Sequence, residues 1–282
     1  MDNLQRGKYI IAAIALIFLV GLFYFLFIFN KEAKKADVKE VADEIKQLVD
    51  IEIAKRPFVS LTPTSDGAEI IISVENMSYF DRIEYELTYL ADNPTVAGNK
   101  IQRGSTGTDV NTKDQKYKKS ILLGTASRGV RSPDRGITDG ILTMHMFKGE
   151  TEYQSESQWD LFNISSQSGI LSDRSDKLTI ETSSFSKNYW VILAETLGIP
   201  LSPPFDVKNV QLPIIGAFSV APDFAVPAKI SIKVADNLNP QLFIYTASDS
   251  KWKKLESNYD SSAKEINSKI NSFGTFAVVS AQ

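Results

Sequence analysis

The basic residues between Lys100 and Arg135 are the part of the sequence whose composition points most directly to chemistry. Nine lysines and arginines fall in this stretch against three aspartates, although the 282-residue chain has a net charge of −3. Four glycines interrupt the stretch, which predicts that the charges sit on long loops. Clustered cations attract anionic polymers or lipid head groups over a screening length of about 8 Å at physiological salt. The candidate polyanion contact comprises Lys116, Lys118, Lys119, Arg128, Arg131 and Arg135, and the competing interpretation is a solvated loop surface.

His145 is the only histidine of the chain and stands between two methionines in a segment expected to form a strand. A serine triad would also need a nucleophile on a sharp strand-to-helix turn, and no such motif occurs. A zinc site would need several histidine or cysteine ligands, whereas the chain has one histidine and no cysteine. The residue types therefore indicate an ordinary strand residue here, with no catalytic residues and no metal ligands predicted.

The carboxylates are also grouped, in ways that could serve acid–base catalysis or bind calcium. Glu84/Glu86 and Glu150/Glu152 have strand spacing, which is typical of a solvated face and does not by itself indicate a glycosidase. The segment 173–176 supplies oxygens but lacks the ligand count and the glycine of a calcium loop. No glycine-rich phosphate loop follows an expected strand, and the mild net charge argues against a nucleic acid partner. We therefore expect no cofactor and a protein that is not an enzyme.

Residues 9–29 form one apolar run without a charge or a proline. As a helix rising about 1.5 Å per residue it would span roughly 31 Å, which matches the hydrocarbon core of a bilayer, about 30 Å. A secretory signal peptide has a shorter apolar region followed by a small-x-small cleavage site, and no such site follows Phe29. The run predicts an uncleaved single-pass transmembrane helix, preceded by a short cytoplasmic tail over 1–8.

The charges on either side of this run are nearly balanced and determine its direction poorly. Arg6, Lys8 and the amino terminus precede it, and four lysines follow it between 31 and 39. Counted alone, these charges slightly disfavour an external carboxyl-terminal region. Because the domains beyond the run look like surface modules, we nevertheless expect a cell-membrane protein with extracytoplasmic carboxyl-terminal domains.

A narrow apolar stripe follows the run. Val38, Val41, Ile45 and Leu48 repeat at 3-4-3 spacing, which predicts an amphipathic helical stalk over 30–56. Two interpretations remain for the stripe: packing on the protein's own first domain, or self-association as a stalk. The stripe is too short to establish a coiled coil.

From residue 57 to 164 the hydrophobic period changes to two. Apolar residues alternate with polar ones most cleanly over 83–90. The expected strands are 58–61, 70–75, 83–90, 96–103, 117–123, 140–147 and 152–162. About seven short strands separated by turn residues predict an immunoglobulin-like or fibronectin type III-like β-sandwich, without the Cys-Trp-Cys framework of antibody domains.

The segment 165–177 is rich in Ser, Asp and Gly, which predicts a linker between two domains. A second β pattern fills 178–282, interrupted by the proline-rich passage 198–213, which is expected to be a covering loop. The strands expected there are 178–182, 189–194, 228–234, 242–246, 252–255, 265–270 and 275–280. The predicted fold is mainly β, with two antiparallel β-sandwich domains after the helical segments.

The final third carries a family resemblance. The series 227–230 (PAKI), 242–245 (LFIY), 251–255 (KWKKL) and 271–278 (NSFGTFAV) resembles the closing β-sandwich of GAIN-type and netrin-receptor-type proteins and of many bacterial surface proteins. The resemblance implies a β-sandwich and a surface location. In autoproteolytic members a His-Phe-Ser type site in the last hairpin cleaves the backbone. Ser272-Phe273-Gly274 lacks the base and the nucleophile, so self-cleavage is not expected.

The sequence as a whole indicates a membrane-anchored cell-surface protein of bacterial type with a non-catalytic binding, adhesion or spacer role. A pilin-like subunit is the first alternative, since an apolar helix followed by a β domain is also the plan of type IV pilins. Lys8 after Gly7, and Ala12 in place of a glutamate, depart from that pattern. A membrane-tethered hydrolase is the second alternative. The sequence does not identify the surface polymer or protein that would be the partner. It does not determine the oligomeric state either.

Overall fold

The computed structural model describes residues 45–183, 185, 189–235 and 239–280. The predicted cytoplasmic tail, the predicted membrane helix 9–29 and residues 30–44 of the predicted stalk lie outside this range. In the part that the structure describes, no helix is long and apolar enough to cross a membrane. The described residues from Lys46 onward belong to one compact unit.

The predicted stalk helix is wrong over its described part. This segment forms strand β1 (Ile45–Gln47) and two 3-10 helices, η1 (Leu48–Asp50) and η2 (Ile53–Lys55). Leu48 and Ile51 are buried in the first hydrophobic core, at 3% and 7% exposed. Packing of these side chains overrides the helical period, because tertiary burial outweighs the small free energies of helix propensity.

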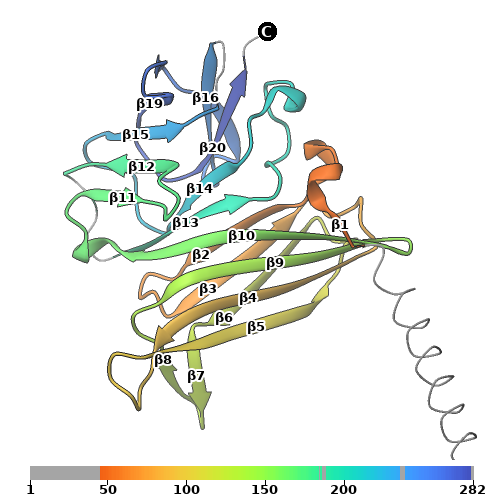
Figure 1. The fold of residues 1–282 in the computed structure, drawn as a ribbon, viewed down its shortest axis with the longest axis vertical. Helices are drawn as coiled ribbons and strands as arrows, with labels where there is room; N and C mark the ends of the chain where they lie inside the picture. Colours follow the sequence, from red (N-terminus) through yellow and green to blue (C-terminus); the bar gives the residue numbers. More distant parts are fainter. Residues whose placement is uncertain (1–44, 184, 186–188, 236–238, 281–282) are drawn as a thin grey trace, which may run out of the picture. The chain divides into compact units, whose positions relative to one another are not determined.

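The prediction of a mainly β protein is confirmed. The described residues form several antiparallel sheets, the largest of which has ten strands (Figure 1). Its order is β17-β16-β20-β14-β13-β10-β9-β4-β5, with β1 paired to β10. Three smaller sheets have the orders β11-β12-β15-β19-β18, β2-β3-β6 and β7-β8.

The first half of this unit lies around one hydrophobic core. Its strands are β2 (Phe58–Pro63), β3 (Glu69–Glu75), β4 (Arg82–Asp92), β5 (Lys100–Val110), β6 (Lys116–Leu122), β7 (Gly124–Ser127), β8 (Val130–Pro133), β9 (Thr138–Lys148) and β10 (Thr151–Asn163). Alternate residues of β3 and β4 point into the core. They include Ile70, Ile72 and Leu87, whose exposed fraction is 0%. The period of two thus places one face of each strand inside, as the alternation predicts.

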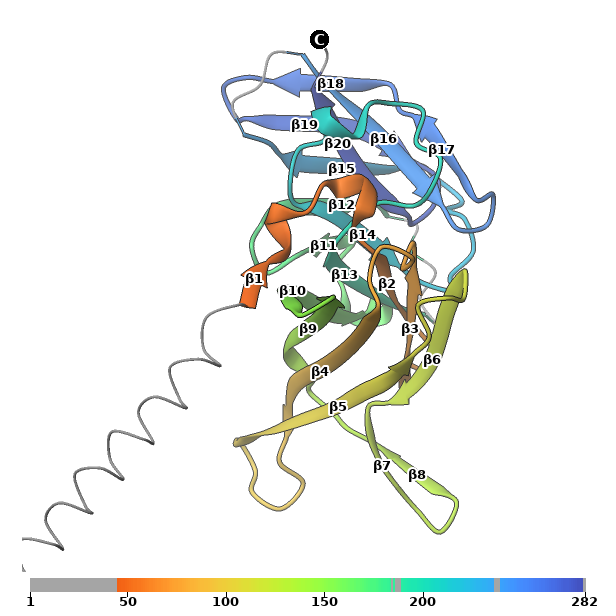
Figure 2. The ribbon, with the colours of Figure 1, turned by 90° about the vertical axis from the view of Figure 1, so that its right-hand side faces the viewer.

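The second half has a core of its own. Its strands are β11 (Ile170–Ser172), β12 (Leu178–Glu181), β13 (Trp190–Thr196), β14 (Ile214–Phe218), β15 (Ala228–Lys233), β16 (Pro240–Thr246), β17 (Lys251–Lys254), β18 (Ser257–Asp260), β19 (Glu265–Ile270) and β20 (Thr275–Ser280). Two further 3-10 helices, η3 (Ile164–Ser166) and η4 (Val207–Asn209), lie in the connections. Figure 2 shows β15, β18 and β19 facing β16 and β20 across this core.

Strand β13 joins the two halves. Ile192 and Ala194 belong to the first core, whereas Val191 and Leu193 belong to the second. A strand buried on both faces needs apolar side chains at successive positions, which explains the continuous run Val191–Ala194. The ladder between β10 and β13 carries the ten-stranded sheet across the predicted linker 165–177.

Arg174 ties this linker segment to the first half. Its Nε donates to Asp160 Oδ1 at 2.8 Å, and its Nη2 donates to the carbonyl oxygens of Trp159 and Gly140 at 2.8 and 3.0 Å. Charge-assisted bonds of this kind are shorter and stronger than neutral ones. The segment 165–177 is therefore hydrogen-bonded to the sheet and includes strand β11.

Several strands lie where the sequence suggested loops. The expected strand 96–103 is displaced, since β5 runs from Lys100 to Val110, and β7, β8, β11, β14 and β18 were not expected at all. β5, β7 and β8 bury few side chains, so they leave no hydrophobic alternation in the sequence. β14 is short and is buried at every position, so it shows no alternation, and periodicity cannot distinguish such a run from a buried helix segment.

Candidate functional site

The six cations of the candidate polyanion contact lie mainly on strands. Lys116, Lys118 and Lys119 belong to β6, Arg131 belongs to β8, and Arg128 lies in the turn between β7 and β8. Arg135 follows β8 in a connection. The expectation that these charges sit on long loops is therefore wrong for most of them, because the glycines of this region form hairpin turns and cross-strand contacts.

Lys116, Lys118 and Arg131 share the outer face of the sheet β2-β3-β6. Lys116 pairs with Glu75, and Arg131 reaches from β8 to pair with Glu69 on β3. The alternation of β6 places Lys118 on the same face as Lys116, opposite Ser73. Two of the three positive charges on this face are thus compensated by glutamates.

Lys119 points to the other side of β6, toward the rim of the first core. Its Nζ donates to both oxygens of Asp109, at 3.1 and 3.0 Å, and the hydroxyl of Tyr117 donates to Asp109 at 2.9 Å. The hydrogen bond with Lys119, followed by that with Tyr117, holds the pKa of Asp109 below its usual value. Burial raises the pKa of Tyr117 above its usual range, with further contributions from Tyr85 and Asp109. Lys119 therefore stabilises the rim and is separated from the other cations.

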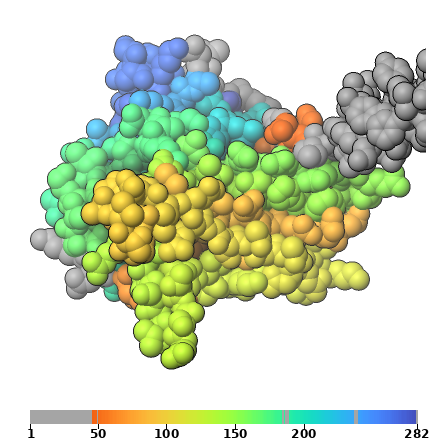
Figure 3. All heavy atoms as spheres, turned by 60° about the horizontal axis from the view of Figure 1, so that its bottom comes forward, coloured from red at the N-terminus to blue at the C-terminus, as the bar shows by residue number. Residues whose placement is uncertain are grey.

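The β7–β8 hairpin extends away from the neighbouring strands β5 and β6 (Figures 2 and 3). All its residues except Gly124 are exposed, and Val130 is 70% exposed. Arg128 and Gly129 form the turn, with φ angles of 49° and 80°. The left-handed conformation at two successive positions is that of a type I′ hairpin turn, which presents Arg128 at the tip.

The six cations therefore do not form one continuous patch. Among the described residues, no ion pair or side-chain hydrogen bond involves Lys118, Arg128 or Arg135, whereas Lys116, Lys119 and Arg131 are each paired with a carboxylate. The three unpaired cations are the ones whose charge is available to an external anion.

His145 lies on β9 with its side chain 31% exposed. Its Nδ1 is 2.7 Å from Glu152 Oε1 on β10, and Glu84 of β4 is its direct neighbour across the sheet. These groups lie on the solvated side of the sheet, in a hydrogen-bonded cross-strand pair. Among the described residues, no group of three or more His, Cys, Asp or Glu side chains could hold a metal ion.

The carboxylates of the segment 173–176 serve a local turn. Asp173 Oδ1 accepts a hydrogen bond from the backbone N–H of Leu178 at 2.7 Å. Its Oδ2 accepts one from the backbone N–H of Ser175 at 3.3 Å. The carboxylate thus accepts from backbone N–H groups within the turn, as aspartates in turns commonly do.

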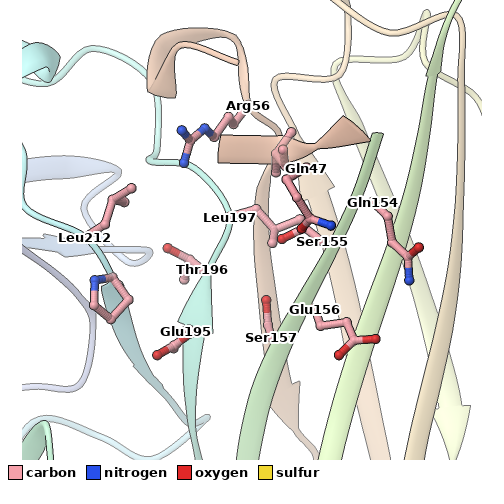
Figure 4. Close-up of a pocket in the computed structure, with 12 residues that line it drawn as sticks. Gln47, Arg56, Gln154, Ser155, Glu156, Ser157, Glu195, Thr196, Leu197 and Leu212 are labelled. Atoms are coloured by element: carbon pink, nitrogen blue, oxygen red, sulfur yellow. The ribbon is translucent and has the colours of Figure 1, made fainter. Parts of the chain in front are cut away.

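A cavity lies where the ten-stranded sheet forks (Figure 4). The ladder between β10 and β13 extends from Asn163↔Trp190 to Trp159↔Ala194 and ends there. Beyond that point the strands diverge around a cavity of about 490 Å³, lined by Gln154–Ser157 from β10 and by Glu195–Leu197 at the end of β13. Gln47, Leu48 and Arg56 from the amino-terminal segment, and Leu212 and Pro213, complete its wall.

Polar side chains dominate the chemistry of this fork cavity. Lys177 pairs with Glu195 at 2.9 Å, and the hydroxyl of Thr196 donates to the carbonyl oxygen of Gly198. Arg56 is 7% exposed and donates from Nε to the carbonyl oxygen of Ile51 at 2.7 Å. Burial lowers the pKa of Arg56 from its usual value. The cavity can donate and accept hydrogen bonds, and its lining contains no histidine or cysteine.

No sequence signal predicted the fork cavity. Its residues come from four segments far apart in the chain, and each segment contributes only two to four residues. Glu195 directly follows the apolar run Val191–Ala194, and Arg56 precedes a proline. Only the divergence of β10 and β13 brings them together.

Comparison with known protein families and with curated proteins finds no match to this chain.

Proposed function

We propose that the protein is a single-pass membrane protein that binds an anionic surface polysaccharide without catalysing a reaction. In this proposal residues 9–29 anchor the chain, and two β-sandwich halves stand outside the membrane. The apolar run 9–29 supports the anchor, and the two separate hydrophobic cores support the two halves.

The observation that carries the binding role is the β7–β8 hairpin. It contributes no residue to the hydrophobic cores, and it presents Arg128 at an exposed tip. A surface hairpin of this kind adds little to stability, so its charge is free to serve a contact. Lys118 adds a second uncompensated charge on the adjoining outer face of β6.

The binding test uses the full chain in detergent micelles and a polymer of uronic acids immobilised on a sensor surface. We expect Lys118→Glu with Arg128→Glu to weaken binding at least about tenfold, and added salt to weaken binding of the wild type. Lys208→Glu with Lys254→Glu is the matched control, because both lysines are exposed and lie in the second half. Equal loss in the control, or no loss in the test pair, would refute the polymer contact.

Binding to vesicles with anionic lipids but not to the polymer would identify a lipid surface in place of the polysaccharide.

The membrane topology is tested separately. An alkaline phosphatase fused after Gln282 is active only outside the cytoplasm, so an inactive fusion with normal expression would refute the external location.

A further inference from the structure

A second cavity, of about 370 Å³, lies beside the base of the β7–β8 hairpin. Its lining comprises Asp66–Ala68 in the β2–β3 turn, Pro133–Ile137 at the end of β8 and beyond it, Leu161–Asn163 at the end of β10, Ser166 and Gln167 after β10, and Trp190. Its volume is within the range of about 300–1,000 Å³ that is typical of small-molecule sites. We call it the Trp190 pocket.

The indole ring of Trp190 lines one part of this pocket. Trp190 lies flat against Gly67, since a Cβ at Gly67 would be 2.4 Å from two atoms of the indole ring. This contact holds the indole in place although Trp190 remains only partly buried. In the part of the chain that is described, the indole Nε1 has no hydrogen-bond partner, so it can donate to a ligand. Phe162 is also in the lining, but it lies opposite Val191 and its side chain packs against the second core.

Polar groups line the rest. Asp66 accepts hydrogen bonds from the Thr64 hydroxyl at 2.6 Å and from the backbone N–H of Ala68 at 3.1 Å. Asp134 accepts from the Tyr89 hydroxyl at 2.9 Å and lies 3.5 Å from the guanidinium of Arg103. A carboxylate offers about four acceptor positions, so each aspartate keeps capacity for a hydroxyl donor.

The charges of the pocket are mixed, and Arg135 is its cation without an ion-pair partner. Arg103 compensates Asp134, whereas Asp66 stays ionised, because the hydrogen bond from Thr64 leads the causes that keep its pKa below the usual value. Arg135 is exposed and takes part in no ion pair among the described residues. A ligand that suits these groups has an apolar face for the indole ring, several hydroxyls for the carboxylates and one negative charge for Arg135. Two aspartates in the wall disfavour a phosphate, which carries more than one charge.

We infer that the Trp190 pocket binds the pyranose ring of a sugar acid, with its carboxylate near Arg135. The ring presents C–H groups on its faces and hydroxyls around its edge, which matches the division of the lining. This inference rests on the proposed function in that such a sugar would be one unit of the anionic polymer.

The test measures binding of sodium glucuronate to the full chain by ligand-observed NMR, in micelles of a detergent without a sugar head group. Saturable binding is expected, and neutral methyl glucoside is expected to bind at least about tenfold more weakly. Arg135→Ala should weaken glucuronate binding about tenfold or more. Arg135→Lys should weaken it less, because lysine keeps the positive charge that alanine removes.

Trp190→Phe should also weaken binding, and its folding is checked by circular dichroism. Glucuronate should change the tryptophan fluorescence of the wild type and of Trp252→Phe, but not that of Trp190→Phe. If the latter variant does not fold, Arg135→Ala decides alone. No saturable binding, or binding that Arg135→Ala leaves unchanged, would overturn the inference.

The two proposals fail separately. If the Lys118/Arg128 variant loses polymer binding but the wild type does not bind glucuronate, the polymer contact is supported and the pocket inference is refuted. Glucuronate binding that depends on Arg135, with polymer binding that ignores Lys118 and Arg128, would refute the hairpin contact and support the pocket.

Discussion

Gly107 on β5 lies directly opposite Tyr85 on β4, and the ring of Tyr85 occupies the space that a side chain at Gly107 would need. A Cβ at this position would be 2.2 Å from two ring carbons and 2.5 Å from the hydroxyl oxygen. Tyr85 is 2% exposed and its hydroxyl is 3.4 Å from that of Tyr117, so the ring has little room to move. We therefore expect Gly107→Ala to strain the first core.

Overpacking of this kind costs about 1–3 kcal/mol, and alanine returns about 0.4–1 kcal/mol by reducing the conformational entropy of the unfolded chain. The net effect is a loss of about 1–2 kcal/mol in the free energy of unfolding. In a domain of this size that corresponds to a decrease in Tm of about 2–8 °C. Urea denaturation followed by tryptophan fluorescence measures the free energy, and calorimetry measures Tm.

A double-mutant cycle isolates the contact. Tyr85→Leu removes the three atoms in conflict, so in that background Gly107→Ala should cost nothing or stabilise slightly, giving a coupling energy of about 1–3 kcal/mol. Gly98→Ala is the control, since Gly98 has a φ of 80° and no atom within 4 Å of the added Cβ. Its cost comes from the backbone alone and should be the same in both backgrounds. Equal costs of Gly107→Ala with and without Tyr85 would refute the reasoning.

Three further predictions concern stability. Asp109→Asn should reduce the free energy of unfolding at pH 7, because the pKa of Asp109 is lower in the folded protein than in the unfolded chain. The stabilisation by the Asp109 carboxylate is complete above its unfolded pKa of about 3.9. It is lost as the pH falls through the folded pKa. The difference from wild type in urea titrations should therefore shrink as the pH falls below the unfolded pKa, and a difference independent of pH would contradict this. Arg174→Lys should cost about 1–3 kcal/mol because lysine cannot reach both carbonyl oxygens and the carboxylate, and an unchanged urea midpoint would count against it. Leu87→Ala should cost about 2–5 kcal/mol, whereas Val130→Ser should change stability by less than about 0.5 kcal/mol, and comparable midpoints for the two would contradict the assigned burial.

Local patterns in the sequence were sufficient for the β class and for most of the strands with one buried face. Strands β3, β4, β9, β10, β15 and β19 lie close to their predicted ranges, because alternation of apolar and polar residues is a property of neighbouring positions. Strands β5, β7 and β8 could not be found this way, since edge strands and exposed hairpins bury too few side chains to leave a period.

The cationic residues illustrate the same division. Their number and position were evident from the sequence, and they were expected to act together. Which of them keep an available charge depends on cross-strand register: Glu75 lies opposite Lys116 on the neighbouring strand, whereas Ser73 lies opposite Lys118. A register shift of two residues would place Lys118 opposite Glu75, and no local pattern encodes the register.

The sequence by itself determined the apolar run 9–29, the absence of cysteine chemistry and the two regions of β structure. Only the tertiary structure decided that β13 serves both cores, that β10 and β13 part to form the fork cavity, and that Trp190 comes to lie on Gly67 beside Arg135. The physical reason is that period and composition act over a few neighbouring residues. Cavities, ion pairs and ring contacts join positions that are tens of residues apart, and they exist only once the sheets have paired.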